Sequence, residues 1–205
     1  MSHDHPDLPV RDIADARSMR ALAHPLRLRL LEHLALRGPL TATQCAELVG
    51  ESPASCSFHL RQLAKYGFVE EAEGGKGRNR PWRSVATGHR WDTGPDAPAG
   101  ERAAARALTE QFRRHDAELY ADYQRTRDEL PEEWQRAAIE VSLNGYLTAD
   151  ELSQLHEQLH DLWRPYAERV VDPSRRPDDA RLVHLDAVGF PRADENPDEK
   201  GRPRA

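Results

Sequence analysis

Apolar residues recur every three or four positions through most of the first 66 residues. Leucines dominate residues 25–36, and Cys56, Leu60 and Leu63 form a stripe along residues 53–66. This spacing predicts helices over about 12–22, 25–36, 41–50 and 52–67. Pro25 and Pro53 suit first helical positions, and Gly50 suits a helix end. Thr41 or Thr43 is expected to cap the third helix, and Ser52 the fourth.

A short hairpin is predicted directly after the fourth helix. Residues 68–72, Phe-Val-Glu-Glu-Ala, have the composition of a strand, and residues 74–77 form a Gly-rich turn. A return strand is expected over 80–85, where Pro81 indicates a sheet edge. Helices followed by such a hairpin predict a winged helix-turn-helix domain over residues 11–87.

The remaining chain is predicted to be mostly helical. Residues 1–10 are expected to be flexible, 88–100 a Pro/Gly-containing linker, and 191–205 a disordered tail. A long helix is expected over 101–130, and another after Thr148, which begins a capping box with Glu151. Residues 134–146 are ambiguous; the alternation of Ile139, Val141 and Leu143 favours a strand, and 181–190 is a second expected strand. The fold class is therefore mainly α with small β elements (α+β), and residues 101–190 form a C-terminal dimerisation and candidate effector region.

The fourth helix has two chemically different faces. Cys56, Leu60 and Leu63 project to one side and are expected to face the core. The opposite side has small, hydroxylated and basic residues, which allow a helix to approach base edges in a DNA major groove and to contact phosphates. The candidate DNA-binding residues of this helix are Ser52, Ala54, Ser55, Ser57, Phe58, Arg61, Gln62 and Lys65. His59 lies beside the core stripe, so it is interpreted either as a packing residue or as a phosphate contact. A plain helical hairpin with a polar face is the alternative for the whole segment.

The predicted turn of the hairpin is basic. Lys76, Arg78, Arg80 and Arg83 lie within eight residues. Such a wing can lie along phosphates or reach into a minor groove, where Arg is favoured. A solvated charged turn is the alternative.

Charge is divided unevenly along the 205 residues. The net charge of −6 conceals a balance of +5 over residues 19–90 and −7 over residues 101–205. A basic first part and an acidic second part fit one region that faces DNA and one that faces away. No apolar run approaches the about 20 residues that span a bilayer, and the polar N-terminus does not resemble a signal peptide. We therefore expect a cytoplasmic protein without membrane contact.

Three motifs in order resemble the ArsR-type family of winged-helix regulators. Residues 19–34, MRALAHPLRLRLLEHL, are similar to the opening signature of that family. Residues 57–63, SFHLRQL, are similar to its recognition helix, and 67–70, GFVE, to the start of its wing. The resemblance covers about residues 14–87 and implies a homodimeric DNA-binding protein, most often a repressor released by a small effector. It also implies that Ser55, Ser57, Phe58 and Arg61 occupy the base-contacting positions.

The metal-binding pattern of some family members is missing here. Thr41 and Thr43 stand where a Cys-x-Cys pair would lie, and Cys45 and Cys56 fall on expected core positions. Both cysteines are interpreted as small buried hydrophobic residues. His156 and His160 are four residues apart on one helix, a spacing that could hold a metal, but a solvated helix face is preferred. No metal site and no cofactor is predicted.

The long helix 101–130 offers an apolar stripe suited to pairing with its copy in a second subunit; packing on its own domain is the alternative. Two-fold pairing would place two recognition helices about 34 Å apart on a palindromic double-stranded DNA operator. Trp134, Tyr146, Trp163 and Tyr166 are candidate lining residues of an effector pocket, although filling a core is the preferred interpretation.

Three functions compete. The leading hypothesis is a homodimeric, sequence-specific transcriptional regulator, a repressor whose DNA affinity a small effector sets. The alternative is a winged-helix protein-interaction module without DNA binding, in which the acidic C-terminal region binds a basic partner. An enzyme is the least favoured, because the sequence has no Gly-rich phosphate loop, nucleophile elbow or grouped acid and base.

Overall fold

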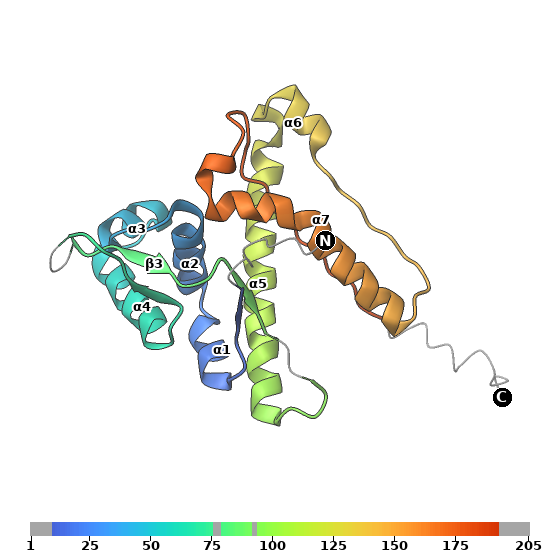
Figure 1. Cartoon of the computed structure of the whole chain (residues 1–205), viewed down its shortest axis with the longest axis horizontal. Coiled ribbons are helices and arrows are strands. Elements are labelled where there is room, and N and C mark those ends of the chain that lie inside the picture. Colours follow the sequence, from blue (N-terminus) through green and yellow to red (C-terminus); the bar gives the residue numbers. More distant parts are fainter. Residues whose placement is uncertain (1–9, 76–78, 92–93, 193–205) are drawn as a thin grey trace, which may run out of the picture.

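A computed structural model describes residues 10–75, 79–91 and 94–192. Four short helices form its first half: α1 (Ala16–Leu22), α2 (Pro25–Arg37), α3 (Ala42–Val49) and α4 (Pro53–Lys65). A long helix, α5 (Ala99–Thr126), runs beside them and continues beyond them (Figure 1). The chain is mainly α with small β elements, which confirms the predicted fold class.

The turn between α3 and α4 is built from local signals. The Thr41 hydroxyl accepts a hydrogen bond from the Gln44 amide, and the Gln44 side chain accepts one from the Thr41 amide, which forms a capping box. Gly50 ends α3 in the left-handed region, at φ 69°. Ser52 then caps α4 by accepting from the Ser55 amide, with Pro53 as the first helical residue. These caps confirm the expected helix-turn-helix and select Thr41 over Thr43.

Two small sheets flank the helices. Strands β2 (Val69–Glu71) and β3 (Trp82–Ser84) pair antiparallel, and Leu40 bridges to Trp82. This is the expected hairpin, with strands shorter than the predicted 68–72 and 80–85.

The second sheet was not predicted. Strands β1 (Val10–Asp12) and β4 (Gly88–Arg90) pair in parallel. The expected helix start at Asp12 is therefore wrong, because α1 begins at Ala16 with Asp15 as its cap. Residues 88–90, expected within a linker, form β4 instead, because they pair with the chain's first described residues.

The hydrophobic core joins the four short helices to the start of α5. Leu22, Leu30, Leu60, Leu63 and Phe68 are fully buried in it. From α5 the core takes Ala104, Ala105 and Leu108, so packing continues past residue 100 into the long helix. The first three turns of α5 thus pack as part of the winged helix.

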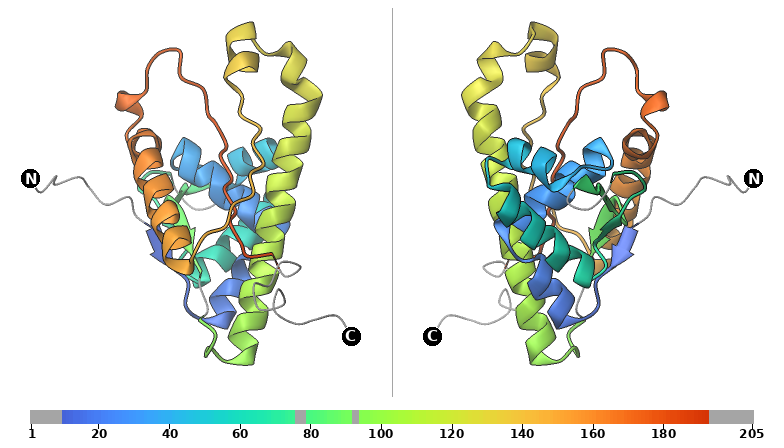
Figure 2. Two further views of the ribbon diagram at one scale, coloured as in Figure 1. Left: turned by 90° about the vertical axis from the view of Figure 1, so that its right-hand side faces the viewer. Right: turned by 90° about the vertical axis from the view of Figure 1, so that its left-hand side faces the viewer.

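From residue 109 to residue 192 the chain has no buried core. It contains η2 (Arg127–Glu129), α6 (Glu132–Ala137), α7 (Ala149–Val171) and η3 (Pro173–Arg175). No residue between 109 and 192 is buried. Figure 2 shows long connections on either side of α7 that lie in no helix or strand. None of the helices in the described ranges is both long and apolar enough to cross a membrane.

Two expected strands are absent from this region. Residues 134–137 lie in α6, and residues 138–147 have no regular structure, so the strand preferred for 134–146 is wrong. Residues 181–190 also lie in no strand. Both segments are extended, but neither forms a backbone ladder with another segment of the described chain. The capping box at Thr148 and Glu151 and the helix after it are confirmed.

Candidate nucleic-acid interface

Helix α4 separates its core stripe from an exposed face as its sequence predicts. Cys56, Leu60 and Leu63 are completely buried. The residues expected to meet DNA are on the outside: Ser52, Ala54, Phe58, Arg61 and Lys65 are exposed, and Ser55, Ser57 and Gln62 are half-buried. The geometry therefore brings the candidate residues of this helix onto one accessible surface.

Two side chains of this surface are arranged relative to each other. The Arg61 guanidinium donates a hydrogen bond to the Ser57 hydroxyl at 2.7 Å, one turn earlier on the helix. This bond limits the freedom of Arg61, so less entropy is lost when it meets a base or a phosphate. Phe58 is 51% exposed, an unusual position for a large apolar side chain, and it is suited to a thymine methyl group.

Polar contacts hold both ends of the helix-turn-helix unit. At the turn, Arg29 of α2 donates to the carbonyl of Val49 at 2.8 Å. At the far end, Arg11 of β1 donates to the carbonyl of Tyr66 at 2.6 Å, and its guanidinium lies 4.3 Å from the centre of the Phe68 ring. A cation at a helix C-terminus is stabilised by the helix dipole. Arg11 therefore positions α4, a role that no pattern in the sequence indicated.

His59 packs against the helix bundle. Its ring centre lies 4.5 Å from that of His24, which precedes α2. Burial and the nearby Arg27 lower the pKa of His59, so the neutral form is favoured. These observations favour the packing interpretation of His59 over a phosphate contact.

The wing is basic, but its two described arginines, Arg80 and Arg83, are each paired with a glutamate. Arg80 lies 2.5 Å from Glu71 and Arg83 lies 2.5 Å from Glu70. Both pairs are about half exposed, and such surface ion pairs contribute little net stability. The arginines can therefore exchange a carboxylate for a phosphate at low cost. Lys76 and Arg78, the other two expected wing residues, lie outside the described residues.

The cysteines behave as hydrophobic residues. Cys45 and Cys56 are both free and fully buried. Burial raises the pKa of the Cys45 thiol to about 11, and it also raises the pKa of Cys56. Because thiolates bind metals and thiols do so poorly, these groups are poor ligands.

The histidine pair on α7 does not form part of a metal site among the described residues. His156 and His160 are exposed, and His160 lies 3.8 Å from Asp161. Within residues 10–75, 79–91 and 94–192, no three His, Cys, Asp or Glu side chains converge closely enough to hold a metal ion.

The four candidate effector residues do not converge on one place. Trp163 and Tyr166 are neighbours on α7, with ring centres 5.6 Å apart. Trp134 of α6 instead lies against Arg181, and Tyr146 is 86% exposed. A pocket that used all four would need a further surface to enclose it.

A charged cluster links α2, α5 and the C-terminal segment. His115 of α5 lies 2.9 Å from Glu32 of α2, and both side chains are largely covered. One residue further along α5, Asp116 lies 3.4 Å from His184, and Arg113 pairs with Asp186. The contact of α5 with Glu32 of α2 thus lies beside the contacts of α5 with residues 184–186.

The pair of His115 and Glu32 predicts a pH-dependent stability. Their hydrogen bond raises the pKa of His115 above 6.5 and lowers the pKa of Glu32 below 4.5, with smaller contributions from Asp116, Glu118, His33 and His184. The His115 contribution is complete below pH 6.5 and is lost as the pH rises through its raised pKa. The Glu32 contribution is complete above pH 4.5 and is lost as the pH falls through its lowered pKa.

The pair should therefore stabilise the fold most between about pH 4.5 and 6.5. We expect His115→Gln to lower the free energy of unfolding by about 1 kcal/mol at pH 5.5, after solvent screening, and by less at pH 9. Urea unfolding followed by circular dichroism measures both values. Arg114→Gln, which breaks an exposed pair with Glu110 on the same helix, is the control and should show no such pH dependence. Equal losses at both pH values for His115→Gln would contradict the assignment.

Comparison with known proteins agrees with this geometry. Residues 22–72 match the model of a helix-turn-helix domain family. The chain is 42% identical over 72 residues to a probable mercury resistance operon repressor from Streptomyces lividans. That match covers 35% of this chain and 52% of the relative, so the chain spans about half the length of the curated relative it matches.

Two solved structures align with this chain at low identity. A protein from Mycobacterium tuberculosis, RV1404, matches over 80% of this chain and 84% of its own at 14% identity and a TM-score of 0.30. A MarR family regulator from Neisseria meningitidis matches over 75% of this chain and 79% of its own at 16% identity and a TM-score of 0.28.

Proposed function

We propose that this chain is a sequence-specific DNA-binding transcriptional regulator, and specifically a repressor. One observation carries the proposal: α4 keeps a buried apolar stripe on one side and exposes Phe58, Arg61 and Lys65 with small residues on the other. A surface of that composition fits a major groove. The matched helix-turn-helix family and the similarity to a resistance operon repressor support the proposal.

The finer assignment is an ArsR-type regulator that acts as a homodimer on palindromic double-stranded DNA. The motifs at 19–34, 57–63 and 67–70 support the family assignment. A two-fold dimer presents two copies of α4 to successive major-groove faces, about 34 Å apart. A small effector bound in the C-terminal region would change DNA affinity only if it binds the two dimer geometries unequally. The aromatic residues Trp134, Tyr146, Trp163 and Tyr166 are the candidates for that site.

Titration of the purified full chain against its own upstream promoter DNA tests the proposal. We expect saturable binding that an unrelated duplex of equal length does not reproduce. Between 50 and 200 mM salt the affinity should fall by about 10³-fold or more, because phosphate contacts release counterions. Fluorescence anisotropy with labelled duplexes measures both effects. Absent or sequence-indifferent binding would instead support a protein-interaction module, and capture of a basic partner would then be tested.

A further inference from the structure

Helix α7 has a regular apolar seam. Leu152, Leu155, Leu159, Leu162 and Tyr166 follow one another at alternating spacings of three and four residues. That pattern places them on one side of the helix, as the a and d positions of two heptads. We refer to these five residues as the α7 seam. Leu162 is 69% exposed, Leu155, Leu159 and Tyr166 are between 40% and 49% exposed, and Leu152 is half-buried.

Other helices and strands leave this seam without a partner. Among the helices and strands of the described chain, α7 packs appreciably only on η3, the turn that follows it directly. The seam's first residue, Leu152, approaches Gly189, and the other four side chains are between 40% and 69% exposed. Tertiary packing of an apolar face supplies most of the stability of helices in proteins. A partner surface over the seam would therefore stabilise α7.

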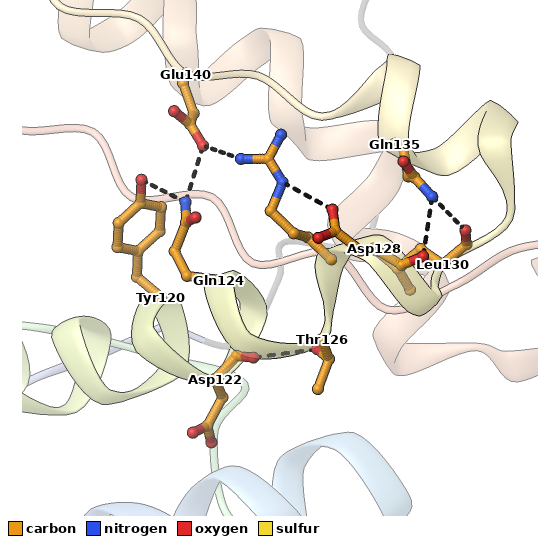
Figure 3. Close-up of polar contacts among 9 residues, drawn as sticks. Tyr120, Asp122, Gln124, Thr126, Asp128, Leu130, Gln135 and Glu140 are labelled. Atoms are coloured by element: carbon orange, nitrogen blue, oxygen red, sulfur yellow. Dashed lines mark hydrogen bonds and ion pairs between the residues drawn. The ribbon is translucent and has the colours of Figure 1, made fainter.

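The two extended segments beside α7 add to the same apolar surface. Residues 138–147 direct Glu140 toward α5, where its carboxylate accepts from Gln124 at 3.0 Å and lies 3.8 Å from Arg127 (Figure 3). Residues 181–190 direct His184 and Asp186 toward α5 as well. Their apolar side chains stay in solvent; Ile139 is 78% exposed. Both segments thus use polar groups to bind α5 and leave apolar groups uncovered.

The amount of uncovered apolar surface is unusual for a single chain. Among the described residues, sixteen of the twenty exposed large hydrophobic side chains lie between Ile139 and Phe190. Soluble monomers rarely expose contiguous apolar patches above a few hundred Å². Exposed apolar side chains in such number are typical of a surface that another chain covers.

We propose that two copies of this chain associate through the α7 seam, with residues 138–147 and 181–190 at its borders. A two-fold axis brings the same patch of each copy together, so an apolar seam meets an apolar seam. The positions that border the middle of the seam are His156 and Gln158, which introduce no pair of like carboxylates. The seam itself has no acidic group that could bind a basic partner. An equally apolar surface, such as the seam of a second copy, is therefore the better complement. The proposal names the surface of the homodimer proposed above, but it does not require DNA binding.

A double substitution in the full chain tests the seam. Leu155→Glu with Leu159→Glu places two charges in the interface and should raise the dimer dissociation constant by about 100-fold or more. Ser153→Glu with Gln154→Glu adds the same charge to the opposite side of α7 and should leave the dimer intact. Sedimentation equilibrium measures the mass, which is 23.2 kDa for one chain. A monomeric parent protein, or a dimer that withstands the double substitution, would overturn the proposal.

A cross-link provides an independent measurement without disturbing the fold. Leu159 is the midpoint of the seam, so it lies beside its own copy whether the two helices run parallel or antiparallel. Under mild oxidation Leu159→Cys should form a disulfide-linked dimer, and Gln154→Cys should not, because the native cysteines are buried. Equal cross-linking of the two variants would count against the seam.

DNA binding separates this proposal from the proposed function. A monomeric Leu155→Glu/Leu159→Glu variant that still binds a half-site duplex weakly, but has lost its preference for the full palindrome, would support both proposals. A parent protein that dimerises through the seam and ignores DNA would leave the seam standing and remove the regulator.

Discussion

Leu60→Ala is expected to lower the free energy of unfolding by about 2–5 kcal/mol. Leu60 is completely buried in the middle of α4, among core residues of the other helices. Removing one methine and two methyl carbons loses the free energy of burying them and leaves a cavity that a close-packed core closes only in part. Urea unfolding followed by circular dichroism at 222 nm measures the change.

Phe58→Ala is the matched control on the same helix. Phe58 is 51% exposed, and substitution of such a residue usually changes stability by less than about 0.5 kcal/mol. Its effect should appear in DNA affinity instead. If Leu60→Ala and Phe58→Ala had equal unfolding free energies, the division of α4 into a core face and an outer face would be wrong.

Arg61→Ala is expected to weaken binding to the upstream promoter DNA by about 10- to 100-fold, which corresponds to one good charged contact with a base or a phosphate. Arg61 is exposed on the outer face of α4, and Ser57 orients it through a bond of 2.7 Å. Fluorescence anisotropy with the promoter duplex measures the loss. Two further measurements then identify the contact. If Arg61 binds a phosphate, its loss makes the slope of log affinity against log salt concentration shallower by about one. If it binds a base, its loss instead relaxes the preference for that base at one position of the site.

Arg125→Ala is the control for charge. Arg125 lies near the end of α5, exposed and paired with Asp122, and its substitution changes the net charge by the same amount. Its DNA affinity should stay within a factor of about two, since long-range attraction between exposed charges is largely screened beyond about 10 Å at 0.1 M salt. Equal losses for Arg61→Ala and Arg125→Ala would show that net charge, and not α4, determines binding.

The helix-turn-helix could be predicted because its signals are local. Thr41, Gly50, Ser52 and Pro53 each act on backbone groups within four residues, so their effect depends little on the rest of the fold. The stripe of buried residues in α4 follows from helical periodicity alone. The exposed face of α4, where most of the candidate DNA-binding residues lie, was therefore accessible from the sequence.

The failed predictions are those that depend on a second segment far away in the sequence. Strands β1 and β4 have three residues each, too few for a periodic pattern, and they pair across 78 residues. The role of Arg11 depends on that pairing. The alternation at 139–143 indicates a two-faced segment, but a strand also needs a neighbouring backbone to bond with. Alternation alone could not supply that neighbour.

The burial of Ala104, Ala105 and Leu108 determines where the chain can be divided. A fragment that ended at residue 100 would expose the surfaces that these side chains cover, and it would lose the helix on which α1 packs. The fragment would also lack Phe112, which stacks on Trp91 with ring centres 4.4 Å apart, so one face of the Trp91 ring would be exposed. A fragment that keeps this core intact therefore ends after Phe112, 25 residues beyond the residue 87 at which the sequence predicts the winged helix to end. An insertion or a proteolytic cut before Phe112 would separate the winged helix from part of its own core.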